Sequence, residues 1–185
     1  AQAIVDIMTP LVKSWCTDMS VRVTSANIQV HGGMGFIEET GAAQLLRDAR
    51  ILPIYEGTNG IQANDLVFRK VLRDGGQAAN AFLDLLESWV KQAPDNALAQ
   101  SLPSSIKSLR SATEWVIAQS NELPKAAAAS TPYLSLFAQV VAGALWAKTL
   151  KDAHSKRESA LAEHYAHTIL SQSEGLLHSI QHGSE

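Results

Sequence analysis

The sequence predicts an all-α protein built from antiparallel helical bundles. Apolar residues recur at three- and four-residue steps through most of the chain, which is the spacing of one helix face. Glycine- and proline-containing turn signals separate these periodic stretches, and we find no stretch with the alternating pattern of a strand. With 185 residues and 46% hydrophobic content, the chain can bury a substantial core.

The first predicted helix begins at Thr9-Pro10 and ends near His31. A threonine can cap free amides at a helix start, and proline at the first helical position loses no hydrogen bond. Glycines at positions 32, 33 and 35 favour a helix end followed by a loop, because glycine tolerates backbone angles that other residues avoid. The apolar residues expected on one face are Leu11, Val12, Trp15, Met19, Val23, Ala26 and Val30.

A second helix is predicted from about Glu39 to Ile51, with acidic residues at its start and arginines near its end, as the helix dipole favours. Pro53 closes it, and residues 54–57 are expected to form a short extended turn. Thr58 can then cap a third helix. The residues expected on the buried side of that helix are Ile61, Leu66, Val67, Val71 and Leu72.

The sequence Asp74-Gly75-Gly76 ends this helix and marks a predicted domain boundary, which divides the chain into residues 1–75 and 76–185. Turn signals beyond it punctuate a sequence rich in alanine, leucine and serine, so the second part is predicted to be a four-helix bundle. Its expected helices span residues 77–92, 97–121, 133–154 and 157–180.

Several residues in these helices are expected to be structural. The apolar stretch 133–147 is too short to cross a bilayer, so it is interpreted as a buried helix. Cys16 lies mid-helix without a nearby base, which favours a buried small residue over a nucleophile. Tryptophans on three separate helices are expected to fill the bundle core rather than form a ligand cage: Trp89, Trp115 and Trp146.

Charge and cysteine content argue against several functional classes. The net charge of -3 gives no excess of cations for nucleic acid or anionic lipid. A single cysteine forms no intrachain disulfide or thiolate cluster and fits a reducing compartment, the cytoplasm. His154, His164 and His167 lack companion ligands at metal-binding spacing, so no metal site is predicted. The start AQAIVDIMTP resembles neither a signal peptide nor an initiation site, which indicates a piece of a longer protein.

One segment with potential chemistry is the glycine cluster in Gln29-Val-His-Gly-Gly-Met-Gly-Phe36. Glycines there would let main chain approach a ligand's phosphates or adenine, although a simple helix stop and turn is the commoner role of glycine at such a place. The cluster is not a dinucleotide-binding fingerprint, because Glu38 occupies the place of the third glycine and no strand precedes it.

A second such segment holds a lone carboxylate, Glu56, between Tyr55 and Gly57. Its neighbours Ile51, Leu52 and Ile54 are apolar, and a carboxylate that is desolvated in such a place is suited to act as a general base. The alternative interpretation is a carboxylate that helps to cap the helix after Thr58.

These two segments, with Leu46-Arg-Asp-Ala-Arg-Ile51 between them, resemble the acyl-CoA dehydrogenase family in order and spacing. The C-terminal helical domain of that family has a glutamine at a helix end, a Gly-Gly-x-Gly-Phe loop, an Arg-Asp helix and a Tyr-Glu-Gly-Thr turn. The shared motifs cover residues 10–73. The continuation over residues 60–70 and the added helices resemble the longer bacterial members that include the methylmercaptopropionyl-CoA dehydrogenases.

The resemblance implies roles for individual residues. Glu56 would be the catalytic base, and the Gly57 backbone would lie near the substrate thioester. Arg47 and Asp48 match a family pair that is expected to form a buried or interfacial ion pair. Contacts to the adenosine diphosphate part of FAD held by a neighbouring subunit are implied for Gln29, Val30, His31, Gly32 and Gly33. Further FAD contacts are implied for Thr58 and Gly60, where many members carry glutamine in place of Gly60.

The implied reaction oxidises an acyl-CoA to a trans-2-enoyl-CoA, as Glu56 takes the α-proton and FAD takes the β-hydride. The resemblance also implies an electron-transfer flavoprotein as electron acceptor and a homodimer or homotetramer. Because the family grips flavin and acyl-CoA largely through domains that precede this region, the chain alone is expected to be inactive and to retain no FAD.

Two alternatives remain open at this point. The first is a flavoprotein of the same fold with other chemistry, such as an acyl-CoA oxidase or a DNA-repair relative, the latter disfavoured by the acidic charge balance. The second is a helical oligomerisation module, in which an apolar face of residues 76–185 meets its copy.

Overall fold

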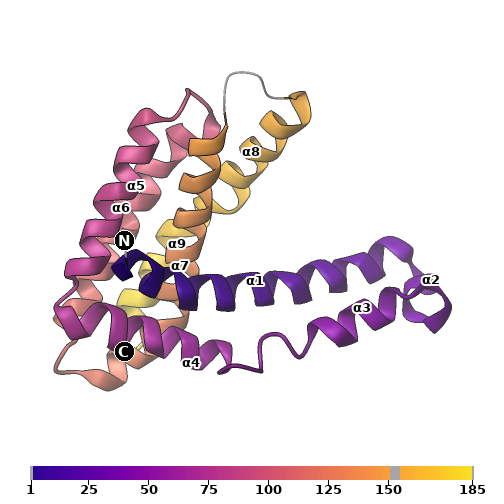
Figure 1. The fold of residues 1–185 in the computed structure, drawn as a ribbon, viewed down its shortest axis with the longest axis horizontal. Helices are drawn as coiled ribbons and strands as arrows, with labels where there is room; N and C mark the ends of the chain where they lie inside the picture. The colour runs from indigo at the N-terminus through magenta and orange to yellow at the C-terminus, as the bar shows by residue number, and fades with distance from the viewer. Residues whose placement is uncertain (1, 151–154, 185) are drawn as a thin grey trace.

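The computed structural model describes residues 2–150 and 155–184, and within those residues every regular element is a helix. This confirms the predicted all-α class. Figure 1 shows two parts of the molecule, an upright bundle and a long arm that leaves its base. The arm is formed by α1 with α2 and α3 at its far end, and α4 returns the chain to the bundle (Figure 1).

The longest element of the arm is α1, Gln2–His31, and it begins before the predicted start. Pro10 lies inside α1 and not at its first turn, so the prediction of a start at Thr9-Pro10 was wrong. Ile7 and Leu11 on either side of this proline are buried in the core. Their packing outweighs the one backbone hydrogen bond that an internal proline removes.

The glycine-rich segment after α1 is more helical than predicted. A single residue, Gly32, separates α1 from the short helix α2, Gly33–Phe36, where a loop was expected. The helix predicted over residues 39–51 is present but shorter, because the 3₁₀ turn η1 occupies its predicted start. The elements that complete the arm are η1 (Glu38–Thr40), α3 (Ala42–Ala49) and α4 (Asn59–Asn64).

The helix predicted after Thr58 continues from α4 into a π-helix, η2 (Asp65–Val71), and a 3₁₀ turn, η3 (Leu72–Asp74). Its expected buried residues include Leu66, Val67 and Val71, and these three are fully buried. Ile61 is exposed, so that part of the prediction was wrong. Ile61 lies in α4, before the π-helix begins. At 3.6 residues per turn it is about 140° around the helix from Leu66, so the two side chains face different directions.

The bundle begins at α5, whose bounds, Gln77–Gln92, are those predicted. The third bundle helix was predicted to start at residue 133, but α7 starts at Leu123 and contains Pro132. The predicted end of that helix, at 154, lies outside the described residues. The predicted helix over residues 157–180 is divided by a 3₁₀ turn. The remaining elements are α6 (Ala97–Ala118), α7 (Leu123–Thr149), α8 (Lys156–Thr168), η4 (Leu170–Gln172) and α9 (Ser173–His182).

The bundle core centres on α7, which contacts α5, α6 and α9 as well as α1 and α4. The ring of Phe137 packs against Phe82 and Tyr133, with centroids 5.9 and 5.8 Å apart. The Tyr133 hydroxyl shares a 2.9 Å hydrogen bond with Thr113 of α6, and burial raises the pKa of this phenol. Ile7 and Leu11 of the arm belong to the same continuous core.

The apolar composition of α7 is explained by this packing. It is long and apolar enough to cross a membrane by those measures alone, but 67% of its most apolar 18-residue window is buried by the rest of the protein. This agrees with the prediction of a buried helix.

The prediction that Cys16 is buried was wrong, and the prediction that the tryptophans fill the core was right only in part. Cys16 is exposed on α1. The three bundle tryptophans are half-buried at the edge of the core: Trp89, Trp115 and Trp146. Trp146 packs edge-on against Tyr165, and the ammonium of Lys148 lies 4.3 Å from the Trp89 ring centre. An indole at the core edge buries its rings and keeps its polar edge near solvent.

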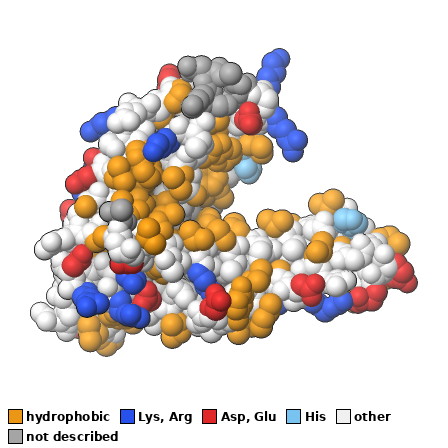
Figure 2. Space-filling view, viewed as in Figure 1, with side chains coloured by type: hydrophobic (Ala, Val, Ile, Leu, Met, Phe, Trp, Pro, Cys, Tyr) orange, Lys and Arg blue, Asp and Glu red, His pale blue; other side chains and the backbone are white. Residues whose placement is uncertain are grey.

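The apolar stripe predicted along α1 is buried only near the bundle. Val12 and Val23 are exposed, and Val30, at the far end, is 84% exposed. Figure 2 shows hydrophobic side chains gathered in the angle between bundle and arm and recurring along the arm. The outer part of α1 contacts the short helices α2 and α3, which leave these valines uncovered.

We expect Phe137→Ala to lower the free energy of unfolding by about 3–5 kcal/mol, because it leaves a cavity beside two aromatic rings. Urea unfolding of the chain, followed by circular dichroism, measures this change. Phe36→Ala is the matched control, because Phe36 is 81% exposed and its loss should change the free energy by about 0.5 kcal/mol or less. Equal effects of both substitutions would contradict this description of the core.

Candidate active site

Glu56 lies in the connection between α3 and α4, where the backbone is held by hydrogen bonds at both ends. The Tyr55 amide donates to the Ile51 carbonyl at 3.2 Å, and the Asn59 amide donates to the Pro53 carbonyl at 3.1 Å. The turn was predicted to be extended, but Glu56 and Gly57 both have positive φ, 56° and 85°. The prediction was wrong because two consecutive left-handed residues reverse the chain tightly.

The left-handed conformation singles out Glu56. Among residues 2–150 and 155–184 it is the one non-glycine residue with positive φ. For a residue with a Cβ, this conformation costs on the order of 1–2 kcal/mol, so surrounding contacts must maintain it. One such contact comes from α4, where the Gln62 side-chain amide donates to the Glu56 carbonyl at 3.0 Å.

Gly57 follows in a conformation that suits glycine. A Cβ at this position would lie 3.3 Å from the Gln62 side-chain nitrogen, so the glycine allows Gln62 to reach the turn. No acceptor among the described residues engages the backbone N–H of Glu56. That amide is therefore available to an external acceptor.

The carboxylate of Glu56 lies on the surface of this chain, so the predicted desolvation by its neighbours does not occur here. Ile51 and Ile54 are themselves about half exposed, as is Tyr55. Glu56 thus shares its turn with apolar side chains that are themselves largely uncovered. Additional protein or a bound apolar group could enclose the carboxylate together with them.

Thr58 and Gly60 lie next to Glu56 at the start of α4, and both are exposed. Thr58 occupies the N-cap position, but its side chain makes no capping hydrogen bond, so the predicted cap was wrong. Nothing lies within 4 Å of the place that a Cβ on Gly60 would take. Both residues therefore present open surface.

The glycine segment at the far end of the arm, residues 29–33, is exposed throughout. Gly32 has φ 60°, and a Cβ on Gly32 or Gly33 would meet nothing within 4 Å. Gly35 is different, because its Cβ would come within 2.5 Å of the Ile28 carbonyl oxygen. Glycine is required at position 35 for packing against α1, whereas Gly32 and Gly33 leave the backbone open to solvent.

The structure does not bring the two groups of predicted cofactor residues into one pocket. The side chain of Asn59 contacts Thr17 of α1, and Gln29 lies 12 residues further along that helix, which corresponds to about 18 Å. The segment 29–33 and the residues around Glu56 therefore lie at separate places along the arm (Figure 1).

A groove of about 580 Å³ lies beside the glycine segment. Its apolar wall includes Ile28, Phe36 and Leu46, and its polar edge is an ion pair between Arg47 and Glu38. Two parallel hydrogen bonds of 2.8 and 2.7 Å join these side chains. Within this chain Arg47 pairs with Glu38 and not with Asp48, because adjacent helical residues point in different directions and η1 places Glu38 within reach of Arg47. An interfacial ion pair of Arg47 and Asp48 stays a prediction.

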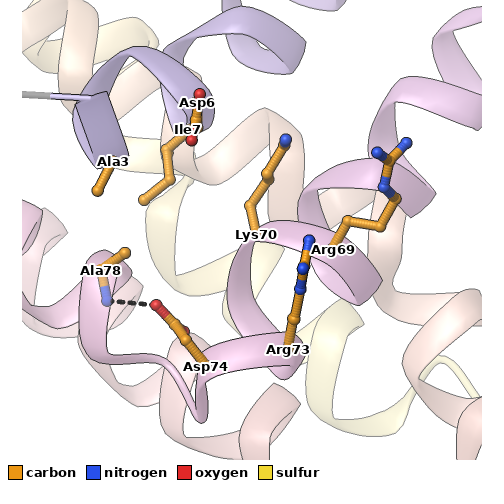
Figure 3. A pocket seen from close by; sticks show the side chains of 8 residues that line it. All are labelled: Ala3, Asp6, Ile7, Arg69, Lys70, Arg73, Asp74 and Ala78. Carbon is orange, nitrogen blue, oxygen red and sulfur yellow. Dashed lines mark hydrogen bonds between the residues drawn. The ribbon is translucent and has the colours of Figure 1, made fainter.

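A second cavity, of about 300 Å³, lies where α1, η2 and α5 meet (Figure 3). It contains three cations that the sequence analysis did not single out: Arg69, Lys70 and Arg73. Asp65 forms ion pairs with Arg69 at 3.0 Å and with Lys70 at 3.8 Å. Asp74 accepts hydrogen bonds from the amides of Gly76 and Ala78, so it joins η3 to the start of α5.

In the part of the chain that the structure describes, no group of three or more His, Cys, Asp or Glu side chains is arranged to hold a metal ion. His164 and His167 lie on α8. His154, the third histidine considered, lies outside the described residues.

Comparison with known families gives two matches. Residues 2–70 match the family described as acyl-CoA dehydrogenase, C-terminal domain. Residues 75–185 match the family described as acetyl-CoA dehydrogenase C-terminal like. Together these matches include the glycine segment, the Glu56 turn and the whole bundle.

Several characterised proteins are similar to this chain. A 3-methylmercaptopropionyl-CoA dehydrogenase from Ruegeria pomeroyi is 44% identical over 149 residues, which cover 77% of this chain and 25% of that protein. A broad-specificity linear acyl-CoA dehydrogenase from Mycobacterium tuberculosis is 35% identical over 91 residues, and a butyryl-CoA dehydrogenase from Syntrophomonas wolfei is 38% identical over 93. Each of these two matches covers 49% of this chain and 15% of the relative. The chain thus spans a quarter or less of these relatives.

We expect Arg47→Ala to return the pKa of Glu38 to its ordinary range. Hydrogen bonding to Arg47, and then attraction to its charge, hold that pKa below the ordinary value. A lowered carboxyl pKa means that the stabilisation is present above the ordinary pKa and is lost as the pH falls through the lowered one. NMR titration of Glu38 measures the change, with Arg50→Ala as the control. An unchanged titration in Arg47→Ala would disprove the pairing.

Proposed function

Since this chain belongs to the acyl-CoA dehydrogenase family, we propose that it is the C-terminal helical part of a flavin-dependent acyl-CoA dehydrogenase. The relatives described above are named for oxidation of acyl-CoA thioesters, which supports this substrate class. Because the matched regions are only parts of those enzymes, activity requires protein that lies outside the matched region. Residues 1–75 belong to the family's helical domain, and residues 76–185 add a bundle to it.

The observation that carries the proposal is the conformation of the Glu56 turn. An exposed carboxylate is held in a left-handed backbone conformation, beside a glycine with the same sign of φ, and shares its turn with largely uncovered apolar side chains. Strain maintained at a single residue is characteristic of functional sites. Glu56 is the catalytic base in this proposal, and Gly57 borders the substrate thioester.

The chemistry assigned to this chain is removal of the substrate's α-proton. The Glu56 carboxylate takes the proton as negative charge develops on the thioester oxygen, and the unengaged Glu56 amide can donate a hydrogen bond to that oxygen. FAD, when bound, accepts the hydride from the β-carbon, so that a trans-2-enoyl-CoA is formed. Closure of the apolar surroundings over the acyl chain would exclude water from the carboxylate.

The residues proposed to contact FAD fit a nucleotide cofactor in one respect, which is access. Gly32 and Gly33 have no side chain, and the space that a Cβ would take at each is empty, so a diphosphate or adenine can approach the backbone closely. The contacts at the far end of the arm are Gln29, Val30, His31, Gly32 and Gly33. Those at the start of α4 are Thr58 and Gly60.

The separation of these two groups along the arm supports contact with cofactors bound in more than one subunit, and hence a homodimer or homotetramer. An electron-transfer flavoprotein is the proposed electron acceptor. A cytoplasmic location is consistent with one free, exposed cysteine and no disulfide in the sequence.

In the full-length enzyme, Glu56→Gln should lower the rate of acyl-CoA oxidation by about 10²–10⁴-fold, because it removes the proton acceptor. Flavin absorbance of the purified variant should stay unchanged. Dye-linked turnover with a panel of acyl-CoA thioesters measures the rate, and Glu39→Gln, an exposed glutamate in η1, is the matched control. Full turnover by Glu56→Gln would refute the proposed role of Glu56.

The 185-residue chain by itself should retain no FAD and show no acyl-CoA oxidation, because the Glu56 surroundings and the glycine segment are open to solvent. The visible absorbance spectrum of the purified chain, incubated with FAD and desalted, is the measurement. Flavin in a 1:1 ratio with protein after desalting would contradict this expectation.

A further inference from the structure

Asn59, the residue that closes the Glu56 turn, has an unusually well-satisfied side chain. Its oxygen accepts hydrogen bonds from the Lys13 ammonium at 2.8 Å and the Thr17 hydroxyl at 3.2 Å. Its nitrogen lies within hydrogen-bond distance of three acceptors, which share its two hydrogens. They are the Asp18 carboxylate at 2.8 Å, the Thr17 hydroxyl at 3.0 Å and the Ser14 carbonyl at 3.1 Å. All these partners lie on α1, so one amide side chain joins the start of α4 to the middle of the arm.

The charges around this amide determine its orientation. A cation faces the oxygen and an anion faces the nitrogen, which is the arrangement that the amide dipole favours. Neither Lys13 nor Asp18 makes another side-chain hydrogen bond or ion pair among the described residues. Both charged side chains therefore interact with Asn59. A flipped amide would place its nitrogen against Lys13 and its oxygen against Asp18.

The backbone of Asn59 continues this connection to Glu56. Its N–H donates to the Pro53 carbonyl at 3.1 Å, which closes the segment that contains Glu56 at its middle. One helical turn later, Gln62 donates to the Glu56 carbonyl at 3.0 Å. The left-handed backbone at Glu56 is thus enclosed by a hydrogen-bonded loop, and Asn59 is the place where that loop is attached to α1.

We propose that Asn59 is a positioning residue, which through Lys13 and Asp18 of α1 fixes the Glu56 carboxylate relative to the substrate. The inference rests on the proposed role of Glu56 as the catalytic base. Proton transfer depends steeply on the distance and angle between base and carbon, and a misplacement of about 1 Å can cost on the order of 100-fold in rate. Asn59 itself contacts no reacting atom in this proposal.

The first test uses Asn59→Ala in the full-length, flavin-loaded enzyme. The expected result is a decrease in kcat of about 10- to 100-fold, with KM for acyl-CoA changed much less and flavin content unchanged. A purely structural role would lower the yield or melting temperature of the holoenzyme and leave kcat per bound flavin unchanged. Wild-type kcat per flavin in Asn59→Ala, together with an inactive Glu56→Gln, would overturn this inference and leave the proposed function standing.

The second test uses charge to distinguish positioning from loss of fold. Asn59→Asp is nearly isosteric but places a carboxylate oxygen against Asp18, so kcat should fall although the side chain keeps its size. Adding Asp18→Asn restores a donor opposite the new carboxylate and should recover much of the lost kcat. No recovery in this double variant would contradict the proposed arrangement, and it remains informative even where Asn59→Ala does not fold.

A third readout is independent of catalysis. The backbone amides of Tyr55, which donates to the Ile51 carbonyl, and of Gln62, which donates to the Thr58 carbonyl, should exchange with deuterium faster in Asn59→Asp than in the wild-type enzyme. The double variant should reverse the change. Amides of the bundle core, for example those of α6, should exchange at unchanged rates. Equal exchange at the turn in all three proteins would show that Asn59 does not hold the Glu56 backbone.

Discussion

The apolar side chains of α7 are buried by helices from both halves of the chain, and the rest of the structure depends on this shared core. Tyr133 and Phe137 pack with α5 and α6, and the end of α1 nearest the bundle contributes Ile7 and Leu11 to the same cluster. Burial contributes roughly 25 cal/mol for each Å² of apolar surface removed from water. The arm therefore leaves the bundle at a place determined by core packing.

The part of the arm beyond Leu11 is held by hydrogen bonds and ion pairs more than by hydrophobic burial. The outer part of α1 exposes Val23 and Val30, so hydrophobic burial within this chain does little to hold it. Polar contacts also join the elements of the arm: Asn59 joins α4 to the middle of α1, and the exposed Glu38–Arg47 pair joins η1 to α3 near the tip. Apolar contacts tolerate small shifts, whereas hydrogen bonds at 2.8 Å specify both distance and angle. Hydrogen bonds therefore suit a turn that must hold a reactive carboxylate in one position.

Glu56, the candidate base, lies between the hydrophobic core and the part of the arm that polar contacts hold. The backbone of Glu56 is strained and supported by a hydrogen bond from Gln62 of α4, while its side chain is exposed in a turn whose apolar residues are also about half exposed. Contacts within this chain maintain the backbone strain at Glu56. Desolvation of the carboxylate requires protein or a ligand outside this chain. The chain can thus define where the base stands without providing the environment in which it would react.

By itself, the sequence determined the all-α class, the bounds of α5 and the family to which the chain belongs, because helical periodicity and ordered motifs are local properties. Tertiary packing decided that Pro10 and Pro132 lie inside helices, since burial of the residues beside them outweighs one lost hydrogen bond. It also decided that Glu56 is left-handed and that Asn59 joins Lys13 and Asp18, more than 40 positions away. Such pairings depend on which segments folding brings together, and spacing along the chain does not encode them.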